Sequence, residues 1–189
     1  MKTTAAVLVL AVAVAASRAW AQGTLYFANG AVGVSSPIYE ADGVTKLSGP
    51  DYLAGLWWSP VPTETNAEAM YFSGLTAPLH TGINAGYFFG GVKPIPGAPA
   101  QAYVAVQVRA WRVQDGADFF SAQAKPGGHW GESNFIQVYL TSGPQPPRNL
   151  VGLQSFNLTV TPLPEPSAFT LAVLGGAVLL LCRRVRPRR

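Results

Sequence analysis

The chain has 189 residues, a formal net charge of +4 and a single cysteine. Residues 22–163 hold six Lys and Arg against eight Asp and Glu, so this body carries 6 − 8 = −2, and the basic excess lies in the two ends. Nucleic-acid binding needs positive charge clustered on the folded surface, so we exclude nucleic acid as a partner. The lone Cys182 lies outside the body, which excludes a disulfide or a catalytic thiol there.

Residues 1–21 have the pattern of a signal peptide. Lys2 supplies a basic start, residues 5–16 are all Ala, Val or Leu, and Ala19-Trp20-Ala21 fits the small-x-small cleavage rule. Cleavage there leaves Gln22 as the mature N-terminus. The alternative is an uncleaved anchor, but the apolar run is short for a membrane span. We therefore expect export through the Sec translocon.

Residues 22–160 are predicted to form one all-β domain. They are rich in Gly, Pro and aromatic residues, lack a long helical periodicity, and alternate short apolar runs with turn residues. This pattern is typical of an antiparallel β-sandwich, with a jelly-roll or an Ig-like topology.

The first half of the body predicts strands over 25–34, 51–58 and 86–92. Asn29-Gly30 predicts a two-residue hairpin turn, because both positions tolerate positive φ. Trp57 and Trp58 are adjacent on a strand and should point to opposite faces, so we expect one of them to be partly exposed. Residues 93–99 hold three prolines and are expected to form a loop.

The second half contains the clearest strand, residues 101–113. One face is expected to be core, and its side chains are Ala102, Val104, Val106, Val108 and Ala110. The other face is expected either to meet solvent or to cover a smaller layer, and its side chains are Tyr103, Ala105, Gln107, Arg109 and Trp111. Residues 135–141 and 153–160 predict two further strands, and 118–124 predict a short helix.

The body shows no recognisable catalytic motif, so we predict no catalytic residue, no metal and no cofactor. The loop 127–133 offers His129 and Glu132 as ligands, or else is a glycine-rich connection with Trp130 folded onto the core edge. We favour the connection, since a metal site needs three or four converging ligands. Asp115 and Asp118 form either a calcium loop or a turn, and we favour the turn because alternating acidic ligands are missing.

The surplus of aromatic side chains is the main hint of a binding role. We take Trp57, Trp58 and Trp130 as candidate carbohydrate contacts, together with Trp111, Tyr103 and Tyr139. The alternative is that these rings only build the core and the strand pairs of the domain.

The C-terminal region divides into a linker, an apolar stretch and a basic end. Residues 161–167 include three prolines and are expected to be stiff and extended. Residues 168–182 carry no charge and would form a helix of about 22 Å. By length this is either a buried helix or a short membrane helix. The 183–189 segment favours the membrane, because its arginines can snorkel and fix the cytoplasmic side: Arg183, Arg184, Arg186, Arg188 and Arg189.

Pro164-Glu165-Pro166-Ser167, followed by the apolar helix and the arginines, resembles the PEP-CTERM sorting signal of bacteria that make extracellular polysaccharide. The resemblance implies processing near 164–166 by an exosortase, a transpeptidase-like membrane protease. It also implies a precursor anchored transiently in the inner membrane and a product at the cell surface or in the extracellular matrix. Residues 107–111, 131–135 and 153–156 resemble parts of a PEP-CTERM-associated group to which no chemistry is assigned.

These observations predict a non-enzymatic protein of the cell envelope with a structural or interaction role. One alternative is a carbohydrate-binding module or adhesin for exopolysaccharide. A second alternative, from another class, is a secreted hydrolase whose site has no recognised motif.

Overall fold

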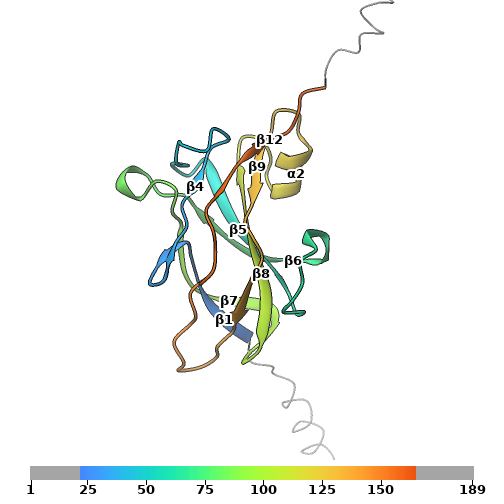
Figure 1. The fold of residues 1–189 in the computed structure, drawn as a ribbon. Helices are drawn as coiled ribbons and strands as arrows, with labels where there is room; N and C mark the ends of the chain where they lie inside the picture. Colours follow the sequence, from blue (N-terminus) through green and yellow to red (C-terminus); the bar gives the residue numbers. More distant parts are fainter. Residues whose placement is uncertain (1–21, 165–189) are drawn as a thin grey trace, which may run out of the picture.

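The computed structural model describes residues 22–164, and within them the fold is all-β, as predicted (Figure 1). Several predictions lie outside the described residues: the signal peptide with Ala19 and Ala21, the motif residues 165–167, the helix 168–182 and the arginines of 183–189. The elements are β1 (Gln22–Ala28), β2 (Gly30–Ala31), β3 (Val34–Ser35), β4 (Ile38–Tyr39), β5 (Tyr52–Ser59), η1 (Ala67–Ala69), β6 (Tyr71–Pro78), η2 (Gly82–Asn84), β7 (Phe89–Pro99), β8 (Tyr103–Arg112), α2 (Phe119–Ala124), β9 (His129–Glu132), β10 (Ile136–Tyr139), β11 (Phe156–Asn157) and β12 (Thr159–Val160).

The main sheet is built around β8, the strand whose alternation is clearest in the sequence. Its strand order is β12-β9-β8-β5-β6, with β10 also paired to β8, and these pairings are antiparallel. β1 and β7 form a separate antiparallel pair that crosses one face of the main sheet (Figure 1). The predicted strand over 153–160 is instead two short strands, β11 beside β4 and β12 beside β9.

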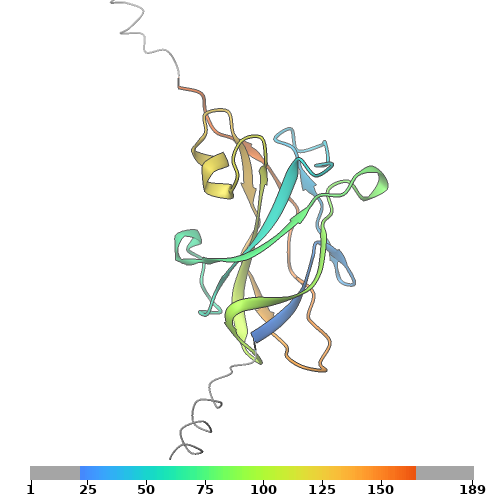
Figure 2. The ribbon, with the colours of Figure 1, turned by 180° about the vertical axis from the view of Figure 1, so that it is seen from behind.

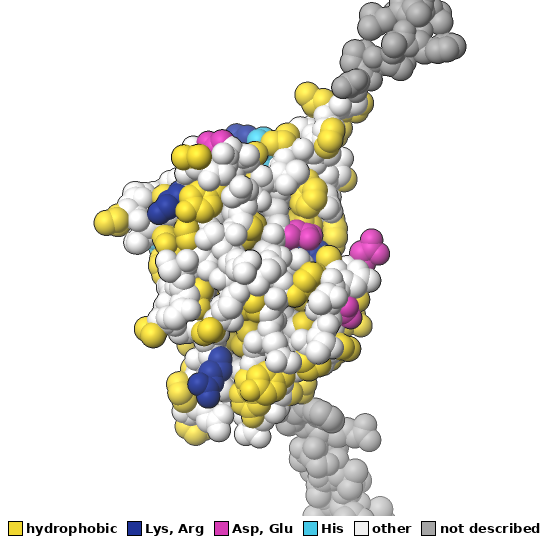
Figure 3. Space-filling view, viewed as in Figure 1, with side chains coloured by type: hydrophobic (Ala, Val, Ile, Leu, Met, Phe, Trp, Pro, Cys, Tyr) yellow, Lys and Arg dark blue, Asp and Glu magenta, His cyan; other side chains and the backbone are white. Residues whose placement is uncertain are grey.

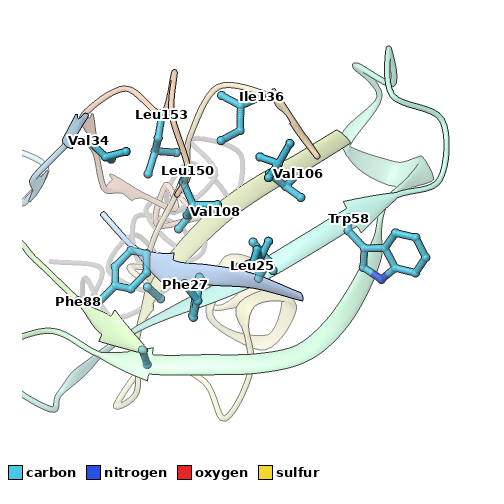
Figure 4. Packing of buried hydrophobic residues seen from close by; sticks show 14 of the residues in the cluster. Leu25, Phe27, Val34, Trp58, Phe88, Val106, Val108, Ile136, Leu150 and Leu153 are labelled. Carbon is cyan, nitrogen blue, oxygen red and sulfur yellow. The ribbon is translucent and has the colours of Figure 1, made fainter. Parts of the chain in front are cut away.

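A single large core fills the space between the main sheet and the β1–β7 pair. The predicted inner face of β8 is confirmed for Val104, Val106, Val108 and Ala110, which are fully buried, whereas Ala102 precedes the strand and is half-buried. Figure 4 shows side chains from β1, β8 and the segment after β10 directed toward this common interior. The labelled members of the core are Leu25, Phe27, Val34, Trp58, Phe88, Val106, Val108, Ile136, Leu150 and Leu153.

The prediction of a loop over residues 93–99 is wrong, because these residues belong to β7. Proline cannot donate a backbone hydrogen bond, so it is tolerated in a strand mainly at a sheet edge or in a bulge. β7 offers both situations. Among the strands of residues 22–164 it is paired with β1 alone, and residues 95–98 stand opposite Gly23 at a shift in register.

The predicted hairpin turn at Asn29-Gly30 is also wrong. The turn lies at Val32-Gly33, between β2 and β3, where Gly33 has a φ of 79°. β1 continues to Ala28 and pairs with β7 instead of folding back on itself.

Asn29 has a different role, as a buried polar link between three segments. Its Nδ2 donates to the carbonyl oxygens of Ser36 and Gly86 at 2.8 and 2.9 Å. Its Oδ1 accepts from the N–H of Phe88 at 2.7 Å. All the side chain's strong hydrogen-bonding groups are used, as a fully buried amide requires.

The outer face of β8 covers a smaller layer, which was one of the two expectations. An outer cluster of buried side chains packs there beneath α2: Trp57, Met70, Ala105, Trp111, Phe119 and Ala122. The short helix is confirmed at Phe119–Ala124, and Asp118 caps it by accepting from the N–H of Ser121 at 2.8 Å.

The described chain ends beside α2 and β9, at the opposite end of the molecule from the start of β1 (Figures 1 and 2). Thr161 is the last residue held firmly there. Its backbone exchanges hydrogen bonds of 2.9 Å with Gly127 and Gly128, and its hydroxyl accepts from the Trp130 indole at 2.9 Å. Residues 22–164 contain no helix long and apolar enough to cross a membrane.

Candidate functional site

α2 and the outer cluster cover only one end of the outer face of the main sheet, and the other end of that face is open. There Tyr103 on β8 stands directly opposite Tyr139 on β10. The next pair along, Val104 and Val138, points inward to the core. Strand alternation therefore forces both tyrosines and Gln137 outward at this end.

The two tyrosine rings pack against each other and remain accessible. Their centroids are 5.1 Å apart with the planes at 64°, an edge-to-face arrangement. Tyr103 is 55% exposed and Tyr139 is half-buried. The pair offers an accessible aromatic surface together with two phenolic hydroxyls.

The segment after β10 forms the second wall and turns this surface into a groove of about 520 Å³. The groove is lined by Tyr103, Gln137, Val138, Tyr139, Pro146, Pro147, Arg148, Asn149 and Val151. The wall is held in place at two points. The N–H of Tyr26 donates to the carbonyl oxygen of Arg148 at 2.9 Å, and the Asn149 amide donates to the carbonyl oxygen of Val32 at 2.9 Å.

Several polar groups of the groove are free to meet a ligand. Within residues 22–164 the hydroxyls of Tyr103 and Tyr139, the amide of Gln137 and the guanidinium of Arg148 have no hydrogen-bond partner or ion pair. Figure 3 shows that charged side chains are scattered over this face, while hydrophobic ones gather toward its lower end. The lining thus supplies aromatic stacking and hydrogen bonds, which suit recognition of a ligand rich in hydroxyl groups.

The three tryptophans named from the sequence do not lie in this groove. Trp57 and Trp58 do point to opposite faces, but they are 3% and 7% exposed, so the expectation that one would be partly exposed is wrong. The sheet is covered on both faces at this level, by the core and by the outer cluster. Trp130 is half-buried, with its ring edge-on to Phe119 at 5.8 Å.

The prediction of a loop over 127–133 is wrong for most of its length, because His129–Glu132 form β9, and the polar side chains of this segment make separate contacts. The Nδ1 of His129 lies 2.8 Å from Asp115, which also meets Lys125 at 3.0 Å. Partial burial raises the pKa of Asp115, but hydrogen bonds from Lys125 and from the ring and N–H of His129 outweigh it and lower the pKa to about 2. Glu132 lies elsewhere, beside Arg109.

Across residues 22–164, no group of three or more His, Cys, Asp or Glu side chains is arranged to hold a metal ion. Asp115 and Asp118 do not converge: the first bonds to His129 and Lys125, and the second caps α2.

Arg109 is the most deeply buried charge of the described chain, with an exposure of 2%. Its Nη2 donates to the carbonyl oxygen of Ala67 at 2.6 Å, and its Nε lies 2.9 Å from Gln107 and 3.4 Å from Glu132. Burial lowers its pKa and Glu132 opposes this shift. The guanidinium also lies 4.8 Å from the centre of the Trp57 ring. These contacts tie η1, β8 and β9 together, so we assign Arg109 a structural role.

No pattern in the sequence indicates the groove wall directly. Tyr103 and Tyr139 are visible as outward positions of two alternating strands, and they were among the candidate aromatic contacts. Arg148 and Asn149 follow a proline-rich run and look like ordinary loop residues, because only the tertiary fold brings them beside the tyrosines.

No protein-family model, curated protein or solved structure matches this chain.

Proposed function

We propose that the chain is an exported, non-enzymatic protein of the cell surface or extracellular matrix, and that its body binds exopolysaccharide in the tyrosine-lined groove. The observation that carries the binding role is the accessible edge-to-face pair Tyr103 and Tyr139 at the open end of the sheet. Sugar rings present apolar C–H faces and polar hydroxyl edges, and tyrosines can meet both.

The proposed export and sorting of the protein rest on the two ends of the sequence. The signal-peptide pattern supports export, and the order of Pro164–Ser167, apolar stretch and arginines supports handling by an exosortase at the membrane. In this account residues 168–182 anchor the precursor transiently in the inner membrane. The processed body then reaches the surface or the matrix.

The arrangement of the described domain is compatible with this route. Thr161 is the last residue held firmly, only three positions before Pro164, and it lies at the α2–β9 end. The segment after β10, which forms one wall of the groove, lies toward the other end of the molecule (Figures 1 and 2). A tail inserted in the membrane would therefore leave the groove facing outward.

We also propose that the domain belongs to the β-sandwiches, of jelly-roll or Ig-like type. Two mostly antiparallel layers, the main sheet and the β1–β7 pair, enclose one core, which supports this assignment. Such domains commonly carry binding sites on an open sheet face or at one end.

The groove is tested by screening the full-length protein, in a neutral detergent, on an array of bacterial polysaccharides. We expect binding to at least one polysaccharide and a loss of about tenfold or more in Tyr103→Ala, because removing one ring takes away stacking energy of about 1.4 kcal/mol or more. Tyr71→Ala is the matched control: Tyr71 is an exposed tyrosine on β6, outside the groove, and its removal should leave binding unchanged. Wild-type protein that binds no polysaccharide would contradict the proposal.

A further inference from the structure

We infer that the ligand of the groove is an acidic polysaccharide, one that carries uronic-acid carboxylates. This inference rests on the proposed function and specifies the ligand class. It comes from the uneven distribution of charged side chains over the described domain. The net charge of the body does not reveal this distribution.

The segments that build the groove end carry no acidic side chain of their own. That end is formed by residues 22–27, 91–107 and 135–151, which contain no Asp or Glu and two cations, Lys93 and Arg148. The rest of the body holds four cations and eight acids, so the charge of −2 divides into +2 at the groove end and 4 − 8 = −4 elsewhere. The acids are Glu40, Asp42, Asp51, Glu64, Glu68, Asp115, Asp118 and Glu132.

The two cations lie near each other and neither is neutralised. Leu25 of β1 pairs with Lys93 of β7 on one side and bridges to Arg148 on the other. Two strand spacings separate these backbones, a distance of about 10 Å. Within residues 22–164 neither cation has an ion-pair partner, whereas Arg109 and Lys125 are each paired with an acid.

An arginine at the rim of an aromatic groove favours a carboxylate ligand. The guanidinium presents a planar set of donors that matches a carboxylate in two parallel hydrogen bonds. The acids concentrated elsewhere on the domain repel a polyanion, so the field directs an acidic chain to the groove end. The tyrosines and Gln137 then meet the rings and hydroxyls of the same chain.

A nucleic acid is a poorer fit for this pattern of charge. Binding to a phosphate backbone gains most of its strength from about 6–10 cationic contacts, and the groove end offers only two cations. A polyuronate carries its charges more sparsely, and its neutral hydroxyls can bond to the uncharged polar groups of the groove.

The test compares polymers that differ only in their carboxylates. Full-length protein in neutral detergent is titrated with pectate, alginate and hyaluronate, and with the methyl ester of each, and the dissociation constants are measured. We expect at least one acid form to bind about tenfold more tightly than its ester, with an advantage that shrinks as salt is raised, because Coulomb attraction is screened. The arginines of the tail contribute the same background in every variant.

Arg148→Gln should remove most of the preference for the acid form, because it weakens binding of the acid form by a larger factor than binding of the ester. Lys93→Gln should reduce the preference by a smaller factor. Arg112→Gln is the control, because Arg112 lies at the far end of β8 and is half-buried.

If the acid and ester forms bind with equal affinity, and Tyr103→Ala abolishes the binding of both, the preference for acidic sugars is overturned. The proposed binding of polysaccharide in the groove would still stand. Failure to bind any of the six polymers or any sugar on the array would count against both. Duplex DNA that binds as tightly as the best polyuronate, with the same dependence on Arg148, would overturn the assignment to polysaccharide.

Discussion

Replacing Asn29 with alanine should lower the free energy of unfolding by about 3–5 kcal/mol, the largest effect we expect from any polar substitution in the domain. The change leaves the buried carbonyl of Ser36 and the buried N–H of Phe88 without a partner, and it takes from the Gly86 carbonyl one of its two donors, the other being the N–H of Ile38. Each buried group left without a partner costs about 1–3 kcal/mol, and partial relaxation or entry of water offsets part of the sum. Urea unfolding followed by tryptophan fluorescence measures the loss.

Two further substitutions show whether hydrogen bonding causes this effect. Asn29→Asp keeps the size of the side chain but places a carboxylate oxygen against the carbonyls of Ser36 and Gly86, so it should be at least as destabilising as alanine at neutral pH. Asn84→Ala alters an exposed asparagine in η2 and should stay within about 0.5 kcal/mol of wild type. If Asn29→Ala unfolds at the same urea concentration as the wild type, the role given to this residue is contradicted.

Arg109→Ala is expected to cost about 3 kcal/mol. It removes hydrogen bonds to Ala67 and Gln107, the ion pair with Glu132 and the contact with the Trp57 ring. Loss of one partner from a buried pair is costly because the remaining polar groups stay in place without compensation. The same unfolding measurement applies.

Arg109→Met separates packing from polarity, because methionine retains much of the volume and none of the charge. We expect Arg109→Met to remain clearly destabilised, and Arg109→Met combined with Glu132→Gln to recover part of the loss. Arg112→Ala, three residues along on the same strand, should change stability by no more than about 0.5 kcal/mol. An Arg109→Ala variant as stable as Arg112→Ala would show that the buried network contributes little.

Alternation along the strands allowed much of the fold to be predicted. The inner face of β8 and the strand near 136–139 follow from a period of two. A strand whose successive side chains alternate between apolar and polar can bury only its apolar face. The short helix after Asp118 follows from its cap.

The errors come from local signals that the tertiary structure overrides. Asn-Gly usually favours a hairpin, but here the amide of Asn29 satisfies backbone groups from distant segments, and this outweighs a local turn preference. Prolines usually end a strand, but β7 tolerates them because it is paired on one side and bulged. Neither outcome follows from sequence without knowing which segments become neighbours.

The residues of the candidate site also differ in how far the sequence predicts them. The outward position of Tyr103 and Tyr139 follows from strand alternation, whereas the wall at Arg148 requires the fold. The tryptophans looked like stronger sugar contacts than the tyrosines, because large aromatic residues are often found at binding sites. Burial of Trp57 and Trp58 under the two hydrophobic layers removes their faces from solvent.

The central claim is that the tail delivers this protein outside the cell and that the groove then retains it on polysaccharide. The most direct measurement is to divide a culture of the producing cells into medium, matrix and envelope, and to determine the mass and amount of the protein in each fraction. We predict matrix-bound wild-type protein that lacks about the last 25 residues, because processing near 164–166 removes the apolar stretch and the arginines together. Tyr103→Ala combined with Tyr139→Ala should be processed in the same way but appear in the medium. Surface protein that still ends at Arg189 would contradict the sorting role, and equal retention of the double variant would contradict the groove.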